Sequence, residues 1–155
     1  MDFRLIKTWV SRLNLTDIPK ETTLQHGQVQ VKHSTAWHTT SLRDFAIIFN
    51  LDLALHEGAL VTVEFYAAFS TEADITEEFK ESHFPNVNAP AVAYPFLRAF
   101  VAQFAALAGF NSFFLPVRNF TEPKAPEETE APKELTVSDS APPSSPATSQ
   151  AASSP

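Results

Sequence analysis

Four stretches in the first half of the chain show the patterning of β-strands, in which alternate side chains face opposite sides. The clearest is QVQVKHSTAWHTT. Its alternation assigns one set of side chains to a single face: Val29, Val31, His33, Thr35 and Trp37. Two further β-rich runs, Phe45 to Leu55 and Ala59 to Phe69, meet at Gly58, a residue that supplies the positive φ of a tight hairpin.

The first of the four stretches, Phe3 to Leu15, alternates more loosely, and Asp17-Ile18-Pro19 ends it. Its apolar positions, assigned to one face, are Leu5, Trp9, Leu13 and Leu15. Four consecutive strands predict an antiparallel meander with two unpaired edges. A long regular edge strand recruits another copy of the chain unless it is blocked, so the pattern favours dimerisation through the sheet.

The pattern changes to that of helices after the fourth strand. The acidic segment Thr71 to Ser82 predicts a short helical turn, and the proline-containing segment His83 to Pro95 predicts a loop. Pro95 suits the first position of a helix and Gly109 the residue just past its end, so we expect a helix over Phe96 to Ala108. The predicted fold class is α+β, a four-stranded antiparallel sheet with one main helix on one face.

This helix is apolar around most of its girth. Its two neighbouring stripes are Phe96, Phe100, Gln103 and Leu107, and Leu97, Val101, Phe104 and Ala108. Such a helix needs cover on two sides, and its own sheet supplies only one. A partner subunit or a bound ligand is expected to supply the other.

Composition divides the chain near Phe120. All 14 Phe, both Trp and both Tyr lie at or before this residue, and 7 of the 12 Pro lie after it. A segment without aromatic residues cannot bury enough apolar area to offset its loss of conformational entropy. We therefore expect one domain over residues 1–120 and a disordered, acidic tail rich in Pro, Ser and Ala over residues 121–155.

Composition and motifs also exclude several classes of function. There is no Cys, the five His lack metal-ligand spacing, and the three Gly form neither a phosphate-binding loop nor a GxSxG motif. The net charge of -7 does not suit nucleic acid. We expect no enzyme, cofactor, metal, signal peptide or membrane insertion, and a cytoplasmic location.

The segment from Asn88 to Phe120 resembles the SecB family of bacterial protein-export chaperones. The resemblance rests on Tyr94-Pro95-Phe96 followed by Arg98, on Gly109-Phe110 after the helix, and on the element Leu115 to Phe120, with Arg118 as an extra residue. Members of that family have the four-stranded sheet predicted above and assemble as a dimer of dimers, with their first helices sandwiched between sheets. A second helix lids the groove in better-known members, whereas here Thr121 begins the tail.

The resemblance implies a chaperone that holds unfolded preproteins in apolar grooves until an export motor ATPase takes them. The implied client-binding residues are Phe84, Val87, Tyr94, Phe96, Phe110, Phe113, Phe114 and Leu115. A core role is the default alternative for each Phe among them, because large aromatic side chains are usually buried. The implied interface of a homotetramer consists of Phe100, Val101, Phe104 and Leu107. Asp17 and Glu64 are the candidates for docking the motor. The alternative is a dedicated partner, such as an antitoxin-stabilising chaperone or an assembly protein, without a general export role.

Overall fold

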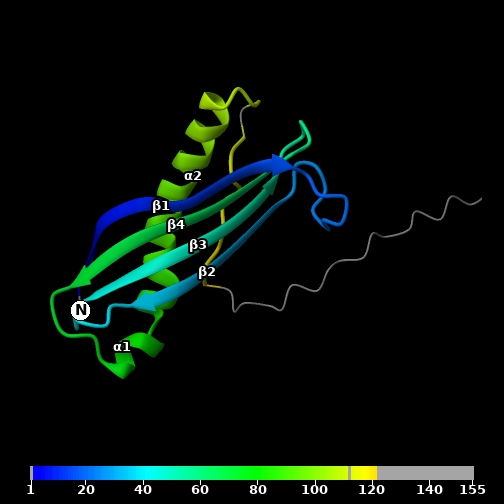
Figure 1. Ribbon diagram of the computed structural model, residues 1–155. Helices are drawn as coiled ribbons and strands as arrows, with labels where there is room; N and C mark the ends of the chain where they lie inside the picture. Colours follow the sequence, from blue (N-terminus) through cyan, green and yellow to red (C-terminus); the bar gives the residue numbers. More distant parts are fainter. Residues whose placement is uncertain (1, 112, 122–155) are drawn as a thin grey trace, which may run out of the picture. The chain divides into compact units, whose positions relative to one another are not determined.

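The computed structural model describes residues 2–111 and 113–121, and the predicted tail lies outside these residues apart from Thr121. Four antiparallel strands form one open sheet in the order β1-β4-β3-β2 (Figure 1). Their bounds are β1 Phe3–Asp17, β2 Val29–Trp37, β3 Asp44–Ala54 and β4 Ala59–Thr71. The predicted fold class and all four strands are confirmed.

The strand order corrects one part of the prediction, because the meander covers only β2, β3 and β4. Residues 18–28 carry the chain from the end of β1 to the far edge of the sheet, so β1 pairs with β4 and not with β2. The pattern of apolar residues determines which face of a strand is buried, but it does not determine the neighbouring strand. The hairpin between β3 and β4 forms as predicted, with Gly58 at a φ of 87°.

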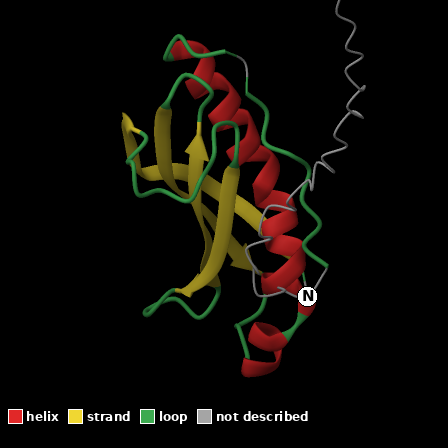
Figure 2. Ribbon diagram, turned by 90° about the vertical axis from the view of Figure 1, so that its right-hand side faces the viewer, coloured by secondary structure: helices red, strands yellow, loops and turns green. Residues whose placement is uncertain are grey.

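One face of the sheet is covered by a helix, and we call it the helix-side face; the opposite one is the outer face (Figure 2). Odd-numbered residues of β3 and β4 point to the helix-side face and are buried there, as Phe49 and Phe65 illustrate. Cross-strand pairing aligns these residues, and Phe45 stacks on Phe69 with their ring centroids 5.3 Å apart. The sheet therefore buries an unbroken apolar surface on one side only.

Two β-bulges in β1 change the face of the sheet to which the side chains between them point. The register shifts between Leu5 and Lys7 and again between Val10 and Arg12. Trp9 consequently pairs with Tyr66 on the outer face and stacks on its ring at 5.0 Å, so the prediction that Trp9 shares a face with Leu5 was wrong. A bulge adds one unpaired residue and thereby inverts the alternation that follows it.

Three helical segments follow the sheet: α1 Glu77–Glu81, the π-helical turn η1 Phe84–Asn88 and α2 Ala89–Leu107. The short α1 confirms the predicted helical turn. The loop expected before Pro95 is wrong, because α2 begins at Ala89 and contains Pro95 in its interior. Burial of Ala93 and Tyr94 against the sheet stabilises the helix across the position where Pro95 removes a backbone donor. The predicted end is confirmed, with Gly109 at a φ of 81°.

The helix packs on the sheet through one stripe of apolar residues, including Leu97 and Val101, which are almost inaccessible to solvent. The continuous helical segment Phe84–Leu107 is also long and apolar enough to span a membrane by length and composition, with a mean hydropathy of 1.3. Core helices of globular proteins have the same property. Here the helix covers the helix-side face of the sheet (Figure 2).

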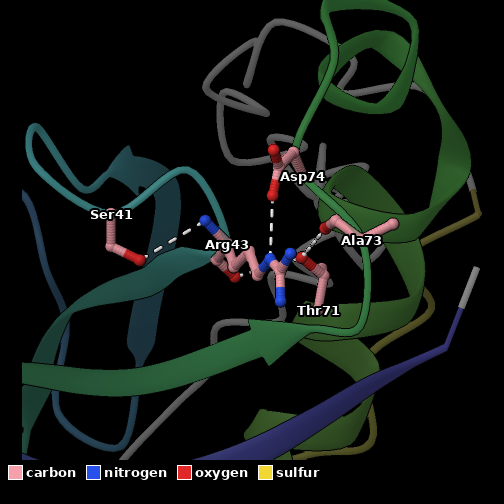
Figure 3. A network of polar contacts seen from close by, with 5 residues as sticks. All are labelled: Ser41, Arg43, Thr71, Ala73 and Asp74. Atoms are coloured by element: carbon pink, nitrogen blue, oxygen red, sulfur yellow. Dashed lines mark hydrogen bonds and ion pairs between the residues drawn. The ribbon is translucent and has the colours of Figure 1, made fainter.

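Polar contacts fasten the β2–β3 connection to the segment that enters α1 (Figure 3). Arg43 pairs with Asp74, with 2.8 Å between Nε and Oδ1. Thr71 Oγ1 donates to the carbonyls of Arg43 and Ala73 at 3.1 and 2.6 Å. These contacts fix the path by which the chain leaves the sheet and turns toward α2.

Replacement of Leu97 by Ala is expected to lower the free energy of unfolding by about 2–5 kcal/mol, because it leaves a cavity between α2 and the sheet. Urea unfolding followed by circular dichroism measures this loss. Leu42→Ala is the control, since Leu42 is 66% exposed in a loop and its loss should change stability by about 0.5 kcal/mol or less. Equal effects of the two substitutions would contradict the packing described here.

Candidate functional site

After α2, the chain returns along the helix as an extended segment, residues 113–121, which we call the arm (Figure 1, yellow to orange). No helix follows α2 within the described residues. Leu115 is 1% exposed and belongs to the hydrophobic core, whereas Phe114 beside it is 72% exposed. The arm therefore covers part of the helix–sheet boundary with some side chains and leaves others in solvent.

Three side chains hold the arm in place through backbone carbonyls. Tyr94 Oη donates to the carbonyl of Pro116 at 2.9 Å, and Arg98 Nε donates to the carbonyl of Leu115 at 2.9 Å. Arg118 of the arm donates to the carbonyl of Val31 on the edge strand β2. Burial raises the pKa of the Tyr94 phenol, so this group remains protonated and donates at neutral pH.

Phe120 anchors the end of the arm in a cluster of aromatic rings. Its ring lies edge-on to Tyr94 of α2 at 5.4 Å, to His33 of β2 at 5.4 Å and to Phe49 of β3 at 6.4 Å. The Arg118 guanidinium lies over the same ring at 5.7 Å from its centroid. We call the residues that the arm contacts on the helix and the sheet the arm seat: Val31, His33, Phe49, Tyr94 and Arg98.

The root of the arm is tied to the β3–β4 hairpin. The backbone N–H and the side-chain amide of Asn111 donate to Glu57 Oε1 at 3.1 and 2.6 Å. These hydrogen bonds lower the pKa of the Glu57 carboxyl below its ordinary value. The carboxylate thus fixes the turn from which the arm departs.

The side of α2 that faces away from the sheet is apolar and exposed. Its large residues are Val92, 45% exposed, Phe96, 48% exposed, and Leu107, 89% exposed, with Ala99 and Gln103 exposed between them. We call these five residues the helix stripe. Large exposed apolar side chains aligned on one helix face are typical of a surface that another polypeptide covers.

The structure separates the predicted client-binding residues into exposed and buried groups. Phe96 and Phe114 are exposed, whereas Phe84, Val87, Phe110 and Phe113 are half-buried. Tyr94 and Leu115 are buried within the chain while the arm is seated, so neither side chain is accessible to a client in this arrangement. Both side chains pack between α2, the arm and the sheet, which is a core role.

The predicted oligomer interface divides in a similar way. Val101 is 1% exposed and packs on the chain's own sheet, so its side chain is not accessible to a partner subunit in this structure. Phe100 and Phe104 are half-buried and stack on each other at 6.2 Å, and Phe100 lies 6.2 Å from Phe65. Leu107 alone of the four is fully accessible. The apolar face of a surface helix covers only about 100° of its circumference. A residue assigned to the wrong one of two neighbouring faces is therefore expected in solvent when it lies in the core, or the reverse.

The two candidates for motor docking do not share a surface. Asp17 pairs with Ala59 in the register of the helix-side face, whereas Glu64 is on the outer face. Ser11 Oγ donates to Glu64 Oε1 at 2.5 Å, and this hydrogen bond lowers the pKa of the carboxyl. An acidic patch built from both residues is therefore absent from the described part of the chain.

The outer face instead carries an apolar hollow of about 260 Å³. Trp9 and Tyr66 form one wall, and three alanines aligned across neighbouring strands, Ala36, Ala46 and Ala68, form its floor. The ammonium of Lys7 lies 5.5 Å from the centre of the Trp9 ring.

Among the described residues, no three His, Asp or Glu side chains are close enough to hold a metal ion.

Sequence reasoning missed Val92 and Arg118 as functional candidates. Val92 lies in the segment that was assigned to a loop, and the four-residue spacing from Val92 to Phe96 would have identified it if Pro95 had been allowed inside a helix. Arg118 was treated as an extra residue. Its hydrogen bond joins positions 87 residues apart, and no local sequence signal indicates such a contact.

Comparison with solved structures defines the class of fold. Neither a protein-family model nor a curated protein sequence matches the chain. Its structure is similar to the Mycobacterium tuberculosis SecB-like chaperone Rv1957, solved in complex with a ChAD peptide from the antitoxin Rv1956 HigA1. The TM-score is 0.57 at 15% identity, covering 76% of this chain and 88% of that chain.

A second similar structure is a Streptococcus agalactiae protein of unknown function, with a TM-score of 0.48 and 12% identity over 76% of this chain and 98% of that one. The similarity to Rv1957 identifies a divergent SecB-like fold: within the described residues, an antiparallel four-stranded sheet is covered on one face by one long helix.

The contact between Glu57 and Asn111 should be lost in acid. Because the pKa of Glu57 is lowered in the folded chain, its stabilising contribution is present above the ordinary value of 4.5 and is lost as the pH falls through the lower, folded value. Amide resonances of Asn111, followed by NMR against pH, should shift with a midpoint below 4.5. Glu57→Gln should abolish that titration, and a midpoint at or above the ordinary value would contradict the contact.

Proposed function

We propose that this protein is a non-enzymatic chaperone that binds unfolded or extended segments of other polypeptides through apolar surfaces. The observation that carries this proposal is the helix stripe, which exposes Val92, Phe96 and Leu107 on the main helix of a SecB-like fold. Apolar burial is non-directional and contributes about 25 cal/mol per Å², so such a surface accepts many sequences. The exposed ring of Phe114 and the half-buried rings of Phe84, Phe110 and Phe113, with Val87, extend the proposed binding surface.

The same helix stripe is suited to self-association. A second copy packed against Phe96 and Leu107 would cover the exposed side of α2, and β1 is an edge strand that is open to pairing. A homotetramer arranged as a dimer of dimers would use both surfaces. In that assembly, Phe100 and Phe104 would lie beside the subunit contact, and clients would bind at the arm and at the part of the helix stripe that the second copy leaves uncovered.

The proposed cellular role rests on the resemblance to the SecB family. We propose a bacterial, cytoplasmic chaperone that keeps preproteins unfolded for export, with an export motor ATPase as its further partner. Asp17 and Glu64 lie on opposite faces of the sheet, so these two residues do not form the acidic patch expected to meet that motor.

A dedicated role is the second candidate. It is favoured by the similarity to Rv1957, whose structure contains a peptide from an antitoxin. A dedicated chaperone of this kind, whether for an antitoxin or for an assembly partner, would use the same apolar surfaces for one client and would need no motor contact. The two roles differ in the range of clients that they protect.

Phe96→Ser should lower the protein's ability to suppress aggregation of a chemically unfolded client, because it removes the largest side chain of the helix stripe. Light scattering in reducing buffer reports aggregation, and scattering of the chaperone alone reports its mass. Leu42→Ser is the matched control on a loop distant in sequence from α2 and should leave suppression unchanged.

The outcomes separate the candidates. Stoichiometric suppression with several unrelated clients supports a general chaperone, and suppression limited to one client supports the dedicated role. The absence of suppression by the unmodified protein, together with no binding of a hydrophobic dye, contradicts both.

A further inference from the structure

The arm is bound to the body of the protein in the way that one polypeptide binds another. No backbone–backbone hydrogen bond joins residues 115–118 of the arm to the rest of the described chain. Side chains hold it instead: Tyr94 and Arg98 donate to two successive carbonyls of the arm, at Pro116 and Leu115. Every residue type presents a backbone carbonyl, so these two donors hold an extended chain without selecting its sequence.

The side chains of the arm complete the pattern. Leu115 is inserted into the core and Phe120 into the cluster of His33, Phe49 and Tyr94, whereas Val117 between them is 83% exposed. Recognition of peptide carbonyls together with apolar pockets for selected side chains is a common mode of binding extended peptides. The arm seat therefore has the components of a peptide-binding site.

We propose that the arm seat is a binding site for extended, apolar polypeptide segments, and that the arm occupies it as a built-in competitor. The preferred segment has a Leu followed by Pro and an aromatic residue five positions after the Leu, which is the spacing of Leu115 and Phe120. This inference rests on the proposed function, since it defines where a client binds and what limits its access.

The competition has a quantitative consequence. A ligand that binds only the arm-released form has an apparent dissociation constant equal to its intrinsic value divided by the released fraction. A tethered competitor acts at an effective concentration in the millimolar range. A free peptide at micromolar concentration should therefore bind the resting protein weakly and should bind a protein with a weakened arm more tightly.

The probe for this test is a fluorescein-labelled peptide with the sequence FFLPVRNF, which is that of residues 113–120. Fluorescence anisotropy measures its binding to the full chain. Leu115→Ala should increase the affinity tenfold or more, because it removes the buried anchor of the arm while the peptide keeps its own Leu. Val117→Ala is the matched control, since that side chain points to solvent, and it should leave the affinity unchanged.

Arg118→Gln provides a second variant that leaves no cavity in the core and loses the hydrogen bond to Val31 and the cation–π contact with Phe120. It should also increase peptide affinity, and a peptide in which Asp replaces Leu should bind none of the proteins. Amide hydrogen exchange reports whether the arm is released in each variant. If both variants fold and release the arm, yet bind the peptide no better than the unmodified protein, the proposal is overturned.

This result is distinguishable from failure of the chaperone function. Tighter peptide binding by both variants without aggregation suppression by any of the proteins would support the arm seat as a peptide site and reject the chaperone role. Suppression by the unmodified protein, with no gain in peptide affinity in either variant, would reject the arm as a competitor and leave the chaperone role intact.

Discussion

The packing of α2 on the helix-side face of the sheet is the interaction on which the rest of the structure depends. Leu97 and Val101 meet a surface formed by the odd-numbered residues of β3 and β4, and Ala93 and Ala105 allow the helix to approach closely. A four-stranded sheet without this cover would expose one entire apolar face. The same contact fixes the rotation of α2 about its axis, and the rotation decides which of its apolar side chains remain in solvent.

That rotation leaves apolar side chains of α2 in solvent. The helix carries more apolar surface than one sheet can bury, so Val92, Phe96 and Leu107 remain exposed at a cost in solubility. If α2 served only to cover the sheet, its solvent-facing positions would carry polar residues, as position 103 does with Gln103. The exposed stripe is therefore the feature that links the fold to polypeptide binding, whether its occupant is a client or a second copy.

The arm covers apolar side chains at the boundary between α2 and the sheet. The boundary between α2 and the edge strand β2 would expose Tyr94 and Phe49 if nothing covered it, and the arm covers it with Leu115 and Phe120. Tyr94 and Arg98 hold the arm through side-chain hydrogen bonds, and no ladder of backbone hydrogen bonds joins it to a strand at these positions. The arm can therefore detach without breaking the sheet. The proposed peptide-binding site is protected in this way without being permanently filled.

The sequence by itself determined the elements that depend on local periodicity: the four strands, the face shared by the odd-numbered residues of β2, the short helical turn of α1 and the end of the main helix at Gly109. It also identified Phe96 and Phe114 as candidates, and both are exposed. These features follow from alternation, helical spacing and the conformational freedom of glycine, which neighbouring residues specify.

Only the tertiary structure decided which strands are neighbours, which face Trp9 occupies and whether Tyr94 and Leu115 are core or surface. Pro95 shows the reason most directly, since a residue that disfavours a helix interior is overridden by burial of Ala93 and Tyr94 on a sheet whose last strand ends at Thr71. Long-range packing selects among conformations that local sequence permits, and the placement of each side chain in or out of the core depends on that selection.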